Sequence, residues 1–284
     1  MSAYYVTGKI PHRELSFDLD RALCSGQLSL VYQPQVSLVT GQLVGMEALA
    51  RWRHPDFGEI TPKVFIEVAE KSGLMSRFTR WVISRACQQN VLWQRRGYRP
   101  LRLAVNVSPS NFVDPGFVDD VADILSQTGL DPCWLELELT ECAILRNREA
   151  AASSMQRLSG MGISLALDDF GSGYASLSHF KDFPINRLKL DRMFLRDLPN
   201  ARCLKGKKLV EGIMMFARHL GIETVAEGIE NESQRTLLNE IGCPVGQGFL
   251  LGAPMTVDEL ESDYRMSSLQ PPCWDRQVPT PLSA

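Results

Sequence analysis

The sequence has 284 residues, of which 44% are hydrophobic and 22% charged, and its formal net charge is −3. This length fits one large domain, and the composition is that of a globular protein. The small negative charge excludes a general attraction to nucleic acid or acidic membranes, so we expect neither as a partner. We also expect no membrane span and no secretion signal, because no apolar run has the required length.

The seven cysteines are odd in number and include no CxxC pair. This pattern argues against a zinc cage and against a disulfide framework. It favours reduced thiols and therefore a cytoplasmic protein.

The first third of the chain predicts a short helix over 14–25 and two strands over 28–36 and 43–51. The turn at 39–42 is too short for a parallel crossover, so the two strands are expected to be antiparallel. On the second strand, Glu47 lies on a face that carries no other charge until Arg51.

The middle of the chain alternates helices with strands. Helices are predicted over 63–72, 76–96 and 115–128, and strands over 101–108 and 134–141. The second of these strands, WLELELTE, alternates without a break and places Glu136 and Glu138 on one face. Taken alone, this is also the pattern of a half-solvated strand.

The stretch ISLALDDFGSGYAS, 163–176, is the most informative. Its strand, 163–168, has one face of leucine and isoleucine and another that is small and then acidic at Asp168. A barrel strand covered by helices has such a greasy outer face and a functional residue at its C-terminal tip. Asp169 and two glycines follow, which alone would indicate only a turn.

The remaining elements repeat the alternation. Strands are predicted over 187–191, 223–228 and 245–249, with helices over 147–160, 204–220 and 231–241. This order indicates an α/β fold. We predict an N-terminal lead over 1–14, one barrel domain over 15–266 and a disordered Pro- and Ser-rich tail over 267–284.

Polar residues recur at the strand ends, where barrel enzymes assemble their sites. Converging carboxylates would repel one another unless cations compensate them. Oxygen ligands without His or Cys favour Mg²⁺ or Mn²⁺, and paired ions about 3.5–4 Å apart are a recurring device for phosphoester cleavage. A structural ion pair with Glu138 or Asp168 is the alternative for Lys189, and a surface position is the alternative for Arg51. The set is Gln33, Glu47, Arg51, Asn106, Glu138, Asp168, Asp169, Lys189, Glu227 and Gln247.

These residues lie in blocks that resemble one family. GMEALARW, with Glu47-Ala48-Leu49, resembles the signature of EAL domains, the bacterial phosphodiesterases of cyclic di-GMP. The accompanying blocks, in the family's order, are YQP, RWRHP, VNVS, ELTE, DDFGSGY, KLD, AEGIE and QGF. The resemblance covers roughly residues 15–256 and implies a modified TIM (β/α)8 barrel whose first strand is antiparallel.

The resemblance also implies roles. Lys189 would act on the attacking water, Gln247 would lie at the catalytic centre, and Glu141 would brace the DDFGSGY loop, which joins a homodimer contact. Gln33, Leu49 and Arg51 would contact the nucleotide. The reaction is hydrolysis of cyclic di-GMP to linear pGpG with two Mg²⁺ or Mn²⁺ ions, and Ca²⁺ should inhibit because it accepts looser geometry. The implied metal ligands are Glu47, Asn106, Glu138, Asp168, Asp169 and Glu227.

Three residues depart from the family pattern, namely Glu67, Pro244 and Phe249, and none belongs to the implied metal ligands. Two alternatives remain: a receptor of the same fold that binds cyclic di-GMP without cutting it, and a hydrolase of another phosphodiester. Receptors of this kind typically lose metal ligands, whereas every implied ligand position is filled here.

Overall fold

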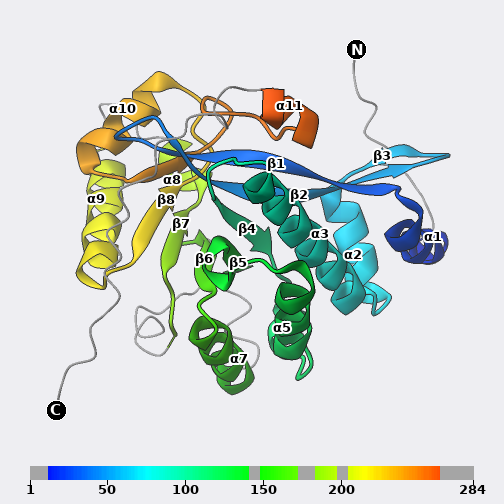
Figure 1. Cartoon of the computed structure of the whole chain (residues 1–284). Coiled ribbons are helices and arrows are strands. Elements are labelled where there is room, and N and C mark those ends of the chain that lie inside the picture. The colour runs from blue at the N-terminus through cyan, green and yellow to red at the C-terminus, as the bar shows by residue number, and fades with distance from the viewer. Residues whose placement is uncertain (1–11, 141–147, 172–182, 197–203, 263–284) are drawn as a thin grey trace.

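A computed structural model describes residues 12–140, 148–171, 183–196 and 204–262 (Figure 1). Its strands form one sheet in the order β1-β9-β8-β7-β6-β5-β4-β2-β3, and the additional pairing of β1 with β2 closes eight of them into a barrel. The strands are β1 (Leu28–Ser37), β2 (Leu43–His54), β3 (Gly58–Ile60), β4 (Arg102–Asn106), β5 (Leu135–Thr140), β6 (Ser164–Phe170), β7 (Arg187–Leu190), β8 (Glu223–Ala226) and β9 (Val245–Gln247).

The strand directions confirm the predicted modified TIM barrel. β1 is antiparallel to both of its neighbours, β2 and β9, whereas the strands from β4 to β9 pair in parallel. β3 is not among the predicted strands. It pairs with the end of β2, which runs three residues beyond the predicted strand, to His54.

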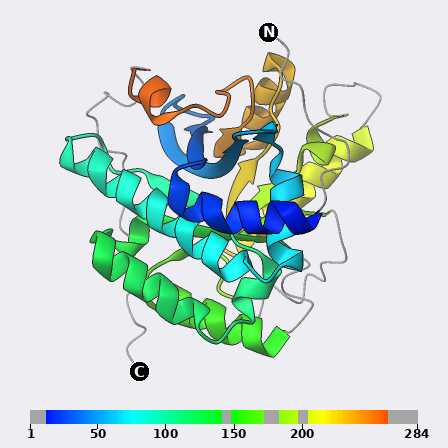
Figure 2. The same ribbon diagram turned by 90° about the vertical axis from the view of Figure 1, so that its right-hand side faces the viewer.

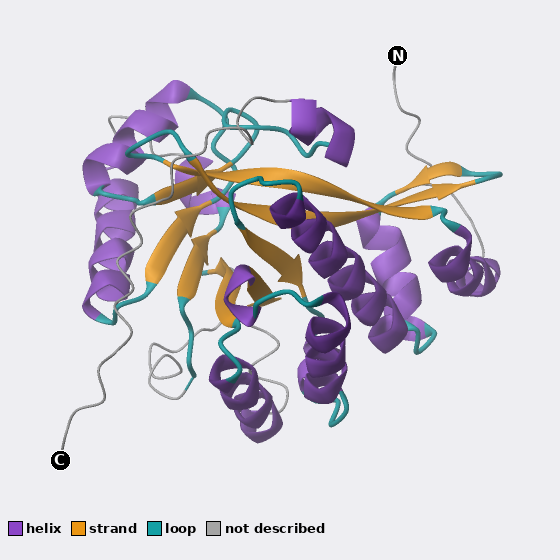
Figure 3. Ribbon diagram, viewed as in Figure 1, coloured by secondary structure: helices purple, strands orange, loops and turns teal. Residues whose placement is uncertain are grey.

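Helices cover the outside of the barrel, as Figure 3 shows. In the turned view of Figure 2, α1 lies beside α2 and α3. None of the helices in the described ranges is long and apolar enough to cross a membrane. The helices are α1 (His12–Ser25), α2 (Pro62–Lys71), α3 (Met75–Arg95), α4 (Pro109–Phe112), α5 (Phe117–Thr128), α7 (Arg148–Gly160), α8 (Arg192–Arg196), α9 (Leu204–His219), α10 (Glu232–Ile241) and α11 (Val257–Ser262), with a 3-10 turn η1 at Pro132–Trp134.

The two faces of each barrel strand differ as predicted. The outward leucines of β4, β5, β6 and β7 are buried between the strands and the helices. The inward residues of β5 are buried too, with Glu136 at 0% and Glu138 at 1% exposure. The alternative of a half-solvated strand at 134–141 is therefore wrong. Burial on both faces is typical of parallel strands covered by helices.

Candidate active site

Four carboxylates surround the ammonium group of Lys189, which projects from β7 and is 1% exposed. Its Nζ lies 2.7 Å from an oxygen of Glu138 on β5 and 2.7 Å from an oxygen of Glu227, which follows β8. Asp168 on β6 is 3.3 Å away and Glu47 on β2 is 3.8 Å away. We call these five residues the upper layer. Its four carboxylates exceed its ammonium by three negative charges.

This excess of negative charge shifts the pKa values of the upper-layer groups. Burial and three neighbouring carboxylates raise the pKa of Glu138 well above its ordinary value, against the opposing effect of Lys189. Burial likewise raises the pKa of Glu227, to about 7. Burial lowers the pKa of Lys189, but the four acids outweigh it and raise that pKa well above normal. The lysine is therefore a fixed cation, and additional positive charge would keep the acids ionised.

Two amides orient the carboxylate of Glu47. Asn106 Nδ2 donates to one oxygen at 2.5 Å, and Gln247 Nε2 donates to the other at 2.5 Å. Gln247 Nε2 also donates to Gln33 Oε1 at 3.1 Å. Because Asn106 directs its nitrogen at Glu47, its oxygen is left for another partner.

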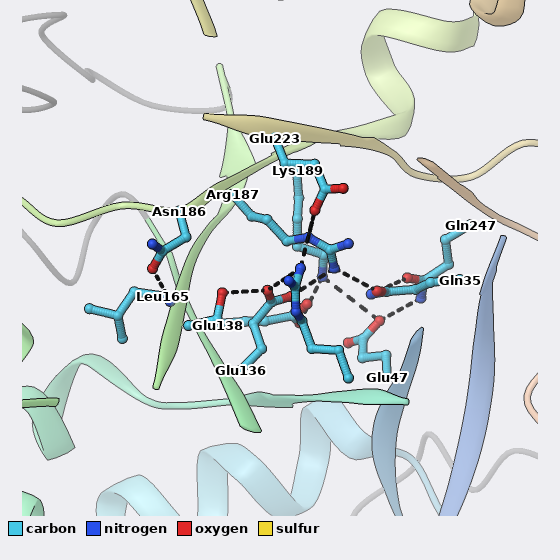
Figure 4. Close-up of polar contacts among 12 residues, drawn as sticks. Gln35, Glu47, Glu136, Glu138, Leu165, Asn186, Arg187, Lys189, Glu223 and Gln247 are labelled. Atoms are coloured by element: carbon cyan, nitrogen blue, oxygen red, sulfur yellow. Dashed lines mark hydrogen bonds and ion pairs between the residues drawn. The ribbon is translucent and has the colours of Figure 1, made fainter. Parts of the chain in front are cut away.

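A second charged cluster lies deeper in the barrel, and Figure 4 shows it beside Lys189. Arg187, two residues before Lys189 on β7, donates to Glu136 at 3.2 Å and to Glu223 at 2.5 Å. Arg102 Nη1 lies 3.1 Å from the same Glu223 oxygen and 3.7 Å from Glu136. We call Arg187, Arg102, Glu136 and Glu223 the lower layer; its two cations match its two carboxylates.

Backbone hydrogen bonds join the segment after β8 to Gln247 and to the loop after β9, while Glu227 N donates to Leu190 O at 3.0 Å. Ile229 N donates to Gln247 O at 3.0 Å, and Leu250 N donates to Ile229 O at 3.0 Å. A Cβ on Gly248 would lie 2.2 Å from Ile229 N, so only glycine allows this approach.

Asp169 adopts a left-handed backbone conformation, with φ of 54°. This conformation is unusual for a residue other than glycine and turns Asp169 away from the strand direction of Asp168. Burial, followed by the charges of Asp168 and Asp191, raises the pKa of Asp169. Asp169 therefore belongs to the same acidic environment, in which the charge of Lys189 acts to lower its pKa.

A cavity of about 320 Å³ opens beside the upper layer, between β2, α2 and the end of β4. Leu49 and Arg51 line it, together with apolar residues and Glu70. Glu70 accepts a hydrogen bond from Ser108 Oγ at 3.0 Å and was not predicted from the sequence. Gln33 lies nearer the centre, where it also donates to Gly252 O at 3.2 Å. Arg51 is half-buried, on β2 at the wall of this cavity.

The donor set of the upper layer fits hard cations. Its oxygens come from carboxylates, and the neighbouring Asn106 adds an amide oxygen. Among the described residues, Glu138 has its ion pair with Lys189, and its second oxygen, Oε1, has no hydrogen-bond partner. Within those residues, no three acid, His or Cys side chains already form a metal cage. Lys189 lies between the carboxylates instead, so the structural ion pairs with Glu138 and Asp168 do exist. Glu141 lies outside the described residues.

Sequence reasoning found the upper layer and missed the lower one. Glu136 and Arg187 each precede an upper-layer residue by two positions, and the alternation placed them on the inner face. Only the residues at the strand ends were selected as candidates. The sequence signal for the lower layer is a second charged residue on the same face of a strand, two positions before the first.

Comparisons with known proteins agree with this geometry. The profile described as the EAL domain matches residues 17–254. The bifunctional diguanylate cyclase/cyclic di-GMP phosphodiesterase MucR of Pseudomonas aeruginosa is 41% identical over 87% of this chain and 36% of its own length. The cyclic di-GMP phosphodiesterase PA2567 of the same organism is 40% identical over 83% of this chain and 40% of its own length. This chain thus spans less than half of these curated relatives.

Solved structures share the fold. The PaMucR phosphodiesterase in its c-di-GMP complex is 41% identical with a TM-score of 0.81, over 87% of this chain and 99% of that one. The EAL enzyme Bd1971, in a form with cAMP and cyclic-di-GMP bound, is 27% identical with a TM-score of 0.82, over 88% of this chain and 68% of that one. Fold, motif order and profile agree, and the chain belongs to the EAL domain family.

Proposed function

We propose that this chain hydrolyses one phosphodiester bond of cyclic di-GMP and releases linear pGpG. The observation that carries this proposal is the upper layer, in which four carboxylates face one ammonium at the rim of a barrel. An excess of buried negative charge has little value for folding, but it suits cations and a phosphate. Relatives named as cyclic di-GMP phosphodiesterases support the choice of substrate.

We assign two Mg²⁺ or Mn²⁺ ions to the upper layer and its neighbours. When bound, such ions supply Lewis-acid chemistry: they neutralise charge on the phosphate and make a water more acidic. The proposed ligands are Glu47, Asn106, Glu138, Asp168, Asp169 and Glu227.

The other residues of the site position the reactants. Lys189 keeps its proton, so it can hold the attacking water through an N–H and stabilise negative charge developing on the phosphate. Gln247 and Asn106 fix the two oxygens of Glu47. Leu49 and Arg51 line the 320 Å³ cavity, which we assign to one guanosine of the substrate. We assign Gln33 to a contact with the same guanosine.

Several expectations extend this proposal. Glu141 bracing the DDFGSGY loop stays a prediction, since both lie wholly or partly outside the described residues. A homodimer formed through elements next to the DDFGSGY loop is also proposed, from the family resemblance. The cytoplasmic location and a domain over 15–266 rest on the cysteine pattern and the motif range.

Incubation of the purified protein with cyclic di-GMP and Mg²⁺ or Mn²⁺, with nucleotides resolved by chromatography, tests the proposal. We expect pGpG with either ion, none with EDTA, and much slower turnover with Ca²⁺, whose bonds are longer and whose geometry is looser. Saturable binding without product would make the chain a receptor. If the protein gave no product and bound no cyclic di-GMP, both the phosphodiesterase and the receptor would be refuted. Equal rates with Ca²⁺ would refute the proposed ligand geometry.

A further inference from the structure

A continuous chain of side-chain hydrogen bonds connects the two layers (Figure 4). Arg187 Nη1 donates to Gln35 Oε1 at 2.9 Å, and Gln35 Nε2 donates to Gln247 Oε1 at 3.2 Å. Gln247 Nε2 then donates to Glu47 Oε2 at 2.5 Å. The three contacts join β7 to β1, β1 to β9 and β9 to β2, and Gln35 and Gln247 are also direct partners in the antiparallel pairing of β1 with β9.

The two ends of this chain fix the direction of both amides. A guanidinium can only donate hydrogen bonds, and an ionised carboxylate can only accept them. Gln35 must therefore turn its oxygen to Arg187, which leaves its nitrogen for Gln247. Gln247 must in turn present its oxygen to Gln35 and its nitrogen to Glu47. If either amide were reversed, two like groups would face each other.

Gln35 cannot satisfy Arg187 and Gln247 with its amide group reversed. Its side chain is 0% exposed, so water cannot replace a lost partner. Gly45 on β2 leaves room for it, because a Cβ there would lie 2.9 Å from Gln35 Oε1. The site is thus built around this one amide orientation.

We propose that Gln35 is a positioning residue for the hydrolysis, which acts by holding the Gln247 amide with its nitrogen toward Glu47 and Gln33. Among the described residues, the hydrogen bonds given for Gln35 go to Gln247 and Arg187, not to Lys189 or its four carboxylates. The inference rests on the proposed function for its kinetic consequence, while the orientation of Gln247 is a property of the protein alone. A residue with a merely structural role would satisfy Arg187 and fill the core without affecting Gln247.

Two substitutions separate these roles, and one control matches them. Gln35→Met has similar length but neither donates nor accepts at the amide positions. Gln35→Glu keeps an acceptor for Arg187 but has no donor for Gln247. Glu136→Gln weakens another contact of Arg187 and leaves the amide chain intact.

The first readout is the side-chain amide resonance of Gln247 in ¹⁵N NMR spectra of the metal-free protein, identified by its loss in Gln247→Leu. We expect Gln35→Met and Gln35→Glu to move this resonance, because the nitrogen no longer has a fixed acceptor in Glu47. Glu136→Gln should leave it in place. An unchanged resonance in both Gln35 variants would overturn the proposal, whether or not the protein hydrolyses cyclic di-GMP.

The second readout is steady-state kinetics at a temperature where all variants are folded. We expect kcat to fall about tenfold in both Gln35 variants, the scale of one net hydrogen bond, with KM unchanged. Glu136→Gln should retain the wild-type kcat. A wild-type kcat in Gln35→Glu would show a merely structural role. Absence of turnover in the wild type would refute the proposed function but leave the NMR result to decide on Gln35.

Discussion

Arg187 and Lys189 lie two residues apart on β7 and are equally buried, yet their surroundings differ. Arg187 and Arg102 meet two carboxylates, so the lower layer is neutral as a set. Lys189 meets four carboxylates, so the upper layer has an excess of negative charge. A buried ion pair roughly compensates its own desolvation, whereas unmatched buried carboxylates raise the free energy of the folded state.

The difference teaches which layer serves the fold and which serves a ligand. The lower layer balances its own charges and connects β4, β5, β7 and β8. The upper layer is incomplete without added positive charge, and its residues extend to the barrel rim, where substrates reach barrel enzymes. Electrostatic balance thus distinguishes a structural cluster from a functional one within a single strand.

The largest expected effect comes from removing a carboxylate of the upper layer. Glu138→Gln and Glu47→Ala should each lower kcat at least about a thousandfold, because a ligand of the proposed cations is lost while the barrel stays folded. Glu136→Gln is the matched control and should retain turnover. Chromatographic assay of pGpG measures both. Turnover near the wild-type rate in Glu138→Gln would place the functional charges elsewhere.

The lower layer should show its largest effect in stability. Arg187→Met leaves Glu136 and Glu223 without their main partner, and breaking such a buried pair typically costs about 3–5 kcal/mol. Urea unfolding followed by circular dichroism measures the free energy of unfolding. Adding Glu136→Gln to Arg187→Met should recover part of the loss, because the unpaired charge is removed. If Arg187→Met unfolds like the wild type, the lower layer is not structural.

The two layers should respond to pH with opposite signs. Burial raises the pKa of Glu227 to about 7 from its ordinary 4.5, so its contribution to stability is complete below 4.5 and is lost as pH rises through 7. Burial also acts to raise the pKa of Glu223, but Arg187 and Arg102 outweigh it and lower that pKa below 4.5. Its contribution is present above 4.5 and is lost as pH falls.

Thermal unfolding in EDTA checks these signs. Glu227→Gln should flatten the loss of melting temperature between pH 4.5 and 7, and Glu223→Gln should flatten the loss on acidification. Identical profiles for both variants would contradict the charge difference between the layers.

The smallest effect is expected at the cavity. Arg51→Ala should raise KM about tenfold and leave kcat nearly unchanged, because an interaction with the nucleotide that is equal in ground and transition states is removed. Arg53→Ala, an exposed arginine two residues further on, is the control. A lower kcat at constant KM would instead assign Arg51 to the reacting phosphate.

The sequence predicted the parts of this molecule that depend on local pattern. The short turn at 39–42 gave the antiparallel hairpin, and alternation identified the inner faces of β5, β6 and β7. The polar residues at the predicted strand ends then identified the upper layer. β3 was missed because its three residues carry no pattern of their own and pair only with the far end of β2.

The contacts within the lower layer could not be predicted for a different reason. Alternation assigns a residue to a face but not to a depth or to a partner. Gln35 and Arg187 are 152 positions apart, and only the closed sheet brings them together. The direction of the Gln247 amide depends on both and is therefore a property of the complete barrel.

The stacking of one layer on the other has a consequence for how the chain finds its register. A sheet with period two cannot detect, from its greasy face, a slip of two residues along a strand. Here such a slip of β7 would move Lys189 into the lower layer and take Arg187 away from Glu136 and Glu223. The alignment found in the barrel is therefore the one in which both arginines of the lower layer meet carboxylates, so the buried charges favour this register over its two-residue neighbours.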